Sequence, residues 1–176
     1  GFLYRVDMRL RPWGQSGPLV STLSGHLDYL GKNARLWEKQ ALLKARPIAG
    51  DFDVGLEFLE QVEPLLLSSD AASIRADVHA MKQRTEQHLR QRGRSWGEVK
   101  LGEGSIRDIE FVVQYLQLSN GKQMPQIQSR NTMESLALLA KHELLQPQEF
   151  RILQDVIPGP ESSLSLGYPW FFTGES

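Results

Sequence analysis

Hydrophobic and polar residues alternate without a break at the start of the chain. The apolar positions are Phe2, Tyr4, Val6, Met8 and Leu10, and the charged positions are Arg5, Asp7, Arg9 and Arg11. Successive side chains of a strand point to opposite faces, so this alternation predicts a β-strand over residues 2–11 with one apolar and one charged face. The turn-forming residues at 12–18 are expected to end the strand.

Beyond residue 20 the apolar residues recur every three or four positions, which is typical of amphipathic helices. The predicted helices cover residues 22–30, 34–46, 51–67, 71–91, 105–118, 132–142 and 147–155. Gly31–Asn33 is expected to break the first helix, and Pro64 to kink or split the third. The pattern therefore predicts a mainly α chain with one strand left from a mixed sheet.

The composition narrows the possible functions. A chain of 176 residues is one domain or a piece of a larger one, and a net charge of −1 argues against a broadly basic nucleic-acid-binding protein. The absence of cysteine excludes disulfides and thiol nucleophiles and fits a cytoplasmic location. The apolar runs are too short to cross a membrane. Because the chain begins with Gly1 in place of an initiator Met and the predicted strand follows at once, we interpret the chain as a piece of a longer protein.

The charged face of the predicted strand is the first candidate for chemistry. Asp7 stands in a row of arginines, with Arg5, Arg9 and Arg11 on the same face. A carboxylate suits Mg²⁺ and guanidinium groups match phosphate geometry, so this face could hold a cation and a polyphosphate together. The alternative is a surface strand on which Asp7 pairs with its own arginine neighbours.

A second candidate lies at the start of the predicted helix at 105–118. The glycine-rich stretch 102–104 precedes it, so its free N–H groups could bind an anion with help from Lys100 and Arg107. Arg107, Glu110 and Gln114 form a polar stripe along this helix. The alternative is that Arg107 and Glu110 form only a surface ion pair. The basic residues Lys44 and Arg46 lie on a third element, and they would join the same anion site.

Three stretches in the right order resemble the glutamine synthetase adenylyltransferase family. They are VDMRLRPWGQSGPLV at 6–20, WEKQALLKARPIAGD at 37–51 and VKLGEGSIRDIEFVVQYLQL at 99–118, with weaker similarity in RNTMESLALLAKHELL at 130–145. The resemblance implies a helical bundle that follows the last strand or strands of a polymerase-β-type nucleotidyltransferase α+β domain. It divides the chain into the end of that domain at 1–50, a helical domain resembling that of PII-uridylyltransferase at 51–155, and an irregular tail at 156–176.

The resemblance also implies roles for individual residues. Asp7 would be the third metal-binding carboxylate of a two-metal site, and no segment that carries the other two is found in this sequence. Nucleotide or phosphate contacts would come from Arg9, Arg11, Lys44, Arg46, Lys100 and Arg107. A face that closes over the site would be formed by Asp108, Glu110 and Gln114. Serine stands at position 105 where the family usually has glycine, and the tail departs from the family's helical pattern.

The implied activity is Mg²⁺-dependent adenylyl transfer from ATP to a tyrosine of glutamine synthetase, or phosphorolysis of the same bond with phosphate to give ADP, in the regulation of nitrogen metabolism. The stretch KLGEGSIRDIEF and the RNTMESLALL segment favour the deadenylylating half. We expect this chain alone to be inactive, with glutamine synthetase and the PII signal protein as partners and neither nucleic acid nor membrane. The alternative function is a non-catalytic helical module that binds PII or glutamine synthetase.

Overall fold

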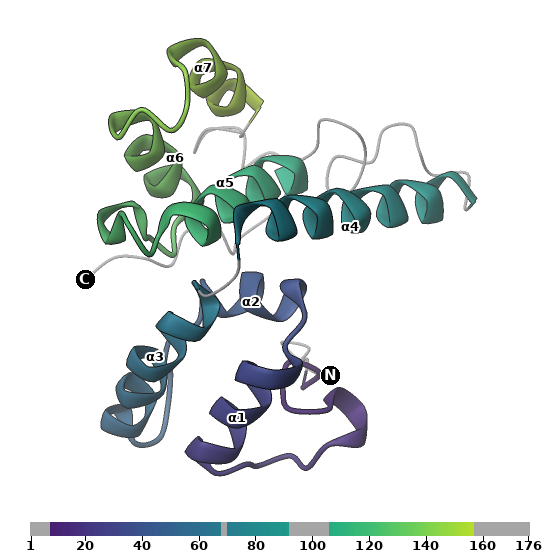
Figure 1. Cartoon of the computed structure of the whole chain (residues 1–176), viewed down its shortest axis with the longest axis vertical. Helices are drawn as coiled ribbons and strands as arrows, with labels where there is room; N and C mark the ends of the chain where they lie inside the picture. Colours follow the sequence, from purple (N-terminus) through teal and green to yellow (C-terminus); the bar gives the residue numbers. More distant parts are fainter. Residues whose placement is uncertain (1–7, 68–69, 92–105, 157–176) are drawn as a thin grey trace, which may run out of the picture.

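The computed structural model of the protein describes residues 8–67, 70–91 and 106–156, where all the regular structure is helical (Figure 1). The α-helices are α1 (Leu23–Asn33), α2 (Leu36–Leu42), α3 (Phe52–Leu66), α4 (Ala71–Gln91), α5 (Ile106–Asn120), α6 (Thr132–Lys141) and α7 (Pro147–Val156). Two short 3-10 helices, η1 (Gly14–Ser16) and η2 (Pro125–Ile127), lie in the connections. The mainly α fold class is confirmed.

The end of the predicted N-terminal strand is not extended. Residues 2–7 lie outside the described residues, but the chain already bends at Leu10 and Arg11. The Arg11 side chain donates from Nη1 to the carbonyl of Met8 at 2.7 Å, and its backbone N–H donates to the carbonyl of Arg9 at 3.0 Å. These local bonds turn the backbone back on itself, so the strand prediction is wrong for residues 10–11.

One predicted helix break does not occur, and Pro64 does not split the helix that contains it. Helix α1 continues through Gly31 to Asn33, and an exposed ion pair between Lys32 and Asp28 links its last turns. Helix α3 runs unbroken past Pro64, which is exposed and lies close to the helix end. A proline there removes one backbone hydrogen bond, and the buried side chains on either side of it hold the last turn in place.

The predicted helix starts depend on side-chain caps. The hydroxyl of Thr22 accepts a hydrogen bond from the N–H of Gly25 at 3.1 Å, and Asp51 and Asn131 cap α3 and α6 in the same manner. Each of these oxygens satisfies an N–H group that the helix itself cannot bond. Helix α2 is shorter than predicted and ends at Leu42, where a tight turn replaces the last helical bonds.

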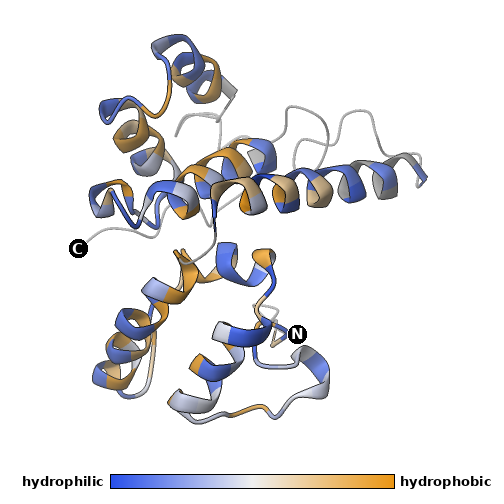
Figure 2. Ribbon diagram, viewed as in Figure 1, coloured by the Kyte–Doolittle hydropathy of each residue, from blue (hydrophilic) through white to orange (hydrophobic). Residues whose placement is uncertain are grey.

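A first hydrophobic core joins the N-terminal helices to the α4–α5 pair. Helix α1 packs on α3, and α2 contacts α4 (Figure 1). The buried members of this core are Leu30, Leu42, Val62, Leu66, Leu67, Ile74 and Leu118. Since Ile74 and Leu118 come from α4 and α5, this core extends over both parts of the chain. Hydrophobic and hydrophilic residues alternate along the ribbon of the helices (Figure 2).

A second core holds α5, α6 and α7 together. It contains Ile109, Val113, Ile127, Leu136, Leu139 and Leu145. Next to it the buried amide of Gln117 donates to the carbonyl of Ser129 at 2.9 Å and to the hydroxyl of Ser135 at 3.0 Å. This polar contact fixes the connection between α5 and α6, and with it the start of α6. Among the described helices, none has both the length and the apolar character that a membrane span requires.

Candidate functional site

Three separate elements meet at the side chain of Lys44. Its ammonium group donates to Glu110 Oε1 at 2.8 Å and to Thr132 Oγ1 at 2.9 Å. Lys44 follows α2, Glu110 lies in the first part of α5, and Thr132 is the first residue of α6. We call Lys44, Glu110 and Thr132 the lysine junction.

Local structure brings each member of the lysine junction into place. Helix α2 ends two residues before Lys44, whose N–H bonds the carbonyl of Ala41 at 3.2 Å in the turn that follows. The cap of α6 is Asn131, and it fixes the backbone that carries Thr132. About a third of each side chain of the Lys44–Glu110 pair is exposed, so solvent screens the pair only in part.

The Lys44 ammonium group has one more hydrogen-bond donor than the lysine junction uses. An ammonium group has three donors, and Glu110 and Thr132 use two of them. Lys44 was predicted to contact nucleotide or phosphate, and the structure places it against Glu110, a residue of the predicted closing face. Arg46, which was predicted for the same contact, is exposed and is not part of the lysine junction.

The other candidate residues of α5 do not gather at the lysine junction. Asp108 Oδ2 accepts from Lys82 Nζ of α4 at 3.1 Å. The guanidinium of Arg107 lies 5.9 Å from the ring centre of Phe111. Gln114 is buried. Asp108 and Glu110 therefore face different lysines, and each carboxylate ties α5 to another element.

The arginine-rich segment is described only in part. Asp7 and Lys100 lie outside the described residues. Arg9 is exposed, and the buried Nε of Arg11 has no hydrogen-bond acceptor. Within residues 8–67, 70–91 and 106–156, no three His, Asp or Glu side chains come together in a way that could hold a metal ion.

A buried carboxylate that the sequence analysis did not single out organises the N-terminal helices. Glu38 is 4% exposed, and it accepts from the Tyr29 hydroxyl at 2.9 Å and from the Arg35 N–H at 2.8 Å. The Tyr29 ring also contacts Trp13 edge-on, with ring centres 5.2 Å apart. Only the capping of α2 by Glu38, three residues after Arg35, could have been found from spacing.

Two titratable side chains next to Glu38 have shifted pKa values. Burial raises the pKa of the Tyr29 phenol above its ordinary value, and the hydrogen bond to Glu38 raises it further. Burial lowers the pKa of His26, an effect that the negative charge of Glu38 opposes. The His26 ring packs on Phe58, with ring centres 5.0 Å apart. These groups are structural neighbours of the α2 start and lie outside the lysine junction.

Comparison with known proteins gives two adjoining family matches. The sequence model described as glutamate-ammonia ligase adenylyltransferase matches residues 1–61, and the one described as GlnD PII-uridylyltransferase matches residues 72–156. The lysine junction connects them, because Lys44 lies in the first match and its two partners lie in the second.

Curated relatives cover most of this chain. Proteins named bifunctional glutamine synthetase adenylyltransferase/adenylyl-removing enzyme match it from Hahella chejuensis (40% identity over 147 residues), Streptomyces avermitilis (43% over 141) and Pseudomonas aeruginosa (40% over 149). These alignments cover 82%, 80% and 84% of this chain, but only 15%, 14% and 15% of the relatives. The chain thus spans about one seventh of their length.

Proposed function

The chain belongs to the glutamine synthetase adenylyltransferase family, and we propose that it supplies one catalytic strand end and the adjoining helical region of an adenylyl-transferring enzyme. In this proposal Asp7 provides a carboxylate for Mg²⁺, and the arginines after it face the phosphates of ATP or of the reverse substrates phosphate and ADP. The substrate protein is glutamine synthetase, acting in the cytoplasm. The proposal follows the functions that the names of the relatives state.

The single observation that carries the proposal is the lysine junction. Two segments that match two different nucleotidyltransferase families are held together by Lys44, through Glu110 and Thr132. The Lys44–Glu110 pair keeps the helical region next to the segment that follows the arginines. Its role in the proposal is to position: it holds the helical region of α5 and α6 against the turn that follows α2. Arg46, Lys100 and Arg107 are proposed to face the same phosphates, and Asp108 and Gln114 to belong with Glu110 to the face that closes over them.

A segment exchange tests the proposal. Residues 1–155 of this chain replace the matching segment of the Pseudomonas aeruginosa relative, and both adenylylation and deadenylylation of glutamine synthetase are measured. We expect both activities to survive the exchange. Changing Asp7→Asn in the exchanged segment is expected to abolish deadenylylation and to leave adenylylation, because the sequence favours the deadenylylating half.

A control variant and the possible results of the Asp7→Asn change show how this exchange tests the proposal. Asp53→Asn removes an exposed carboxylate in α3 and is expected to leave both activities unchanged. Loss of adenylylation alone in the Asp7→Asn protein would assign the chain to the other half. Retention of both activities would overturn the catalytic role of Asp7. The isolated chain is expected to catalyse neither reaction, so strong activity from it alone would also contradict the proposal.

The second candidate function is a helical module that binds the PII signal protein or glutamine synthetase without taking part in chemistry. The match of residues 72–156 to the PII-uridylyltransferase description favours it. Co-precipitation of either protein by this chain, in the absence of Mg²⁺ and nucleotide and undiminished by Asp7→Asn, would support the module. Binding that requires Mg²⁺ and nucleotide would favour the catalytic proposal.

A further inference from the structure

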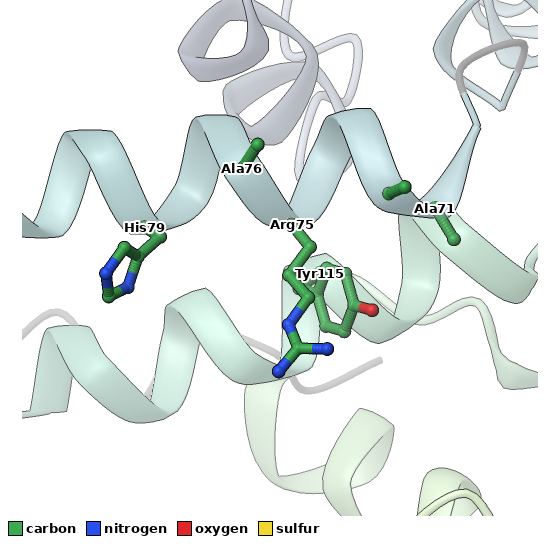
Figure 3. A pocket seen from close by; sticks show the side chains of 6 residues that line it. Ala71, Arg75, Ala76, His79 and Tyr115 are labelled. Carbon is green, nitrogen blue, oxygen red and sulfur yellow. The ribbon is translucent and has the colours of Figure 1, made fainter.

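A hollow between α4 and α5 carries positive charge that no described carboxylate neutralises. Its volume is about 570 Å³, and its lining residues are Ala71, Ala72, Arg75, Ala76, His79 and Tyr115. Figure 3 shows Arg75 and His79 extending from α4 toward α5, with Arg75 alongside the ring of Tyr115. We call this hollow the α4–α5 groove.

The carboxylates of the neighbouring elements are already engaged. On α5, Asp108 bonds Lys82 and Glu110 bonds Lys44. On α2, which packs against α4, the buried Glu38 bonds Tyr29 and the Arg35 N–H.

Arg75 itself has no intramolecular partner in the described part of the chain. Asp77 lies two residues from it, a spacing that places the two side chains on different sides of the helix. Arg75 forms no hydrogen bond or ion pair with a described residue. His79 contacts Gln83 through Nε2 at 3.0 Å, and Gln83 carries no charge. The groove therefore offers a guanidinium and an imidazole, one helical turn apart, to an anion.

The exposure of the lining residues favours a polypeptide occupant over a small molecule. Every lining residue from α4 is exposed, so the groove is shallow. Small-molecule sites usually bury most of the ligand surface, which a shallow groove cannot do. Three alanine methyl groups and an aromatic ring let the backbone and apolar side chains of a segment come close. A guanidinium group such as that of Arg75 can bind a carboxylate in two-pronged geometry.

We propose that the α4–α5 groove docks an acidic segment of a partner protein, with an Asp or Glu carboxylate bound by Arg75 and His79 and an apolar side chain against Tyr115. One ion pair and a small apolar area give weak, reversible binding. This inference does not depend on the catalytic proposal, because no residue of the groove belongs to the lysine junction or to the arginine-rich segment.

The test uses the full chain, labelled for nuclear magnetic resonance, and a short synthetic peptide that combines glutamate with leucine and alanine. We expect the peptide to shift the signals of Arg75, His79 and Tyr115 more than the signals of basic residues outside the α4–α5 groove. The change Arg75→Gln is expected to weaken binding at least fivefold. The matched control is Arg84→Gln, which removes the same charge from an exposed site elsewhere on α4 and should change binding less than twofold.

Three results would overturn the inference. The first is equal binding of a peptide in which every glutamate is replaced by glutamine, because charge would then play no part. The second is an equal response to free glutarate at the same concentration, which would make the groove a small-anion site. The third is an absence of localised shifts, or shifts spread evenly over all basic residues. Circular dichroism of each variant checks that the helices are intact.

Discussion

Lys44 and Glu110 are 66 positions apart in the chain, yet their side chains meet at 2.8 Å. The lysine is the residue that joins the segment after α2 to α5, and Thr132 extends the contact to α6. The pair bridges the two segments that match different families. The contribution of this pair to the free energy of unfolding is therefore the first quantity to measure.

Changing Lys44→Met is expected to lower the free energy of unfolding by about 1 kcal/mol, because a partly buried, charge-assisted contact is lost at two acceptors. Urea unfolding followed by circular dichroism measures the loss. The control is Lys32→Met, which breaks an exposed pair with Asp28 within one helix and should cost at most about 0.5 kcal/mol. Equal effects of the two changes would contradict a bridging role for Lys44.

The buried carboxylate of Glu38 gives a larger expected effect. Changing Glu38→Ala leaves the Tyr29 hydroxyl and the Arg35 N–H without their acceptor, and the expected cost is about 2–4 kcal/mol. Glu57→Ala is the matched control, since Glu57 is exposed and only accepts from Gln61 one turn along α3; its cost should be within about 0.5 kcal/mol. Thermal unfolding of the two proteins compares these changes. A Glu38 variant as stable as the Glu57 variant would show that the buried contact is not important for stability.

The lowered pKa of His26 predicts the direction of a pH effect. Burial lowers the pKa in the folded state below 6.5, so the folded protein binds this proton less readily than the unfolded chain does. The stability that this provides is present above pH 6.5 and is lost as the pH falls through the folded-state pKa. The free energy of unfolding should therefore fall less steeply between pH 7 and pH 5 in a His26→Gln protein.

The matched control for the pH experiment is His142→Gln, at a position outside the His26–Phe58 contact. It removes a histidine from the end of α6. The pH dependence of the His142→Gln protein should follow that of the unchanged chain more closely than the His26→Gln protein does. Identical slopes for the His26→Gln protein and the unchanged chain would exclude a contribution from His26.

The presence of each helix could be predicted from the sequence, because apolar spacing and capping residues are local signals. The bounds of α4 follow from these signals directly. The signals place the starts of α1, α3 and α6 near Thr22, Asp51 and Asn131, but the structure decides which neighbouring residue is the cap. The apolar residues of α3 recur at helical spacing, but they are not all buried, since Leu56 is 56% exposed. The helix buries chiefly Val62 and Leu66 in its second half. Periodicity finds a face, but it does not show how much of that face another element covers.

Only separate members of the lysine junction could be predicted from the sequence, and their contact could not. Lys44 and Glu110 were each singled out, but nothing local indicates that they meet, because their contact depends on how α2, α5 and α6 pack together. Glu38 was missed for the same reason: its burial is a tertiary property. The strand prediction failed at residues 10–11, where side-chain and backbone bonds to Met8 and Arg9 outweigh the alternation.

Gly31, inside α1, and Gly121, in the turn after α5, should respond to alanine in opposite directions. A Cβ added at Gly121 would lie 2.5 Å from the backbone oxygen of Gln117 and 1.9 Å from Gln128 Nε2, which itself bonds that oxygen at 3.0 Å. Gly121→Ala must therefore displace the contact that holds the α5–α6 connection, at an expected cost of about 1–3 kcal/mol. At Gly31 the nearest atom is a flexible Leu65 methyl at 3.8 Å.

Gly31→Ala is thus the matched control for Gly121→Ala, and it should raise stability by about 0.5–1 kcal/mol, since alanine favours the helix and nothing blocks its methyl group. Urea unfolding of both variants supplies the comparison. Hydrogen exchange should show faster opening near the α5–α6 connection in the Gly121 variant only, because the displaced Gln128 amide no longer bonds the Gln117 carbonyl there. If both alanines stabilise the chain, the α5–α6 connection is looser than its hydrogen bonds indicate, and Thr132 would then be less firmly held against Lys44.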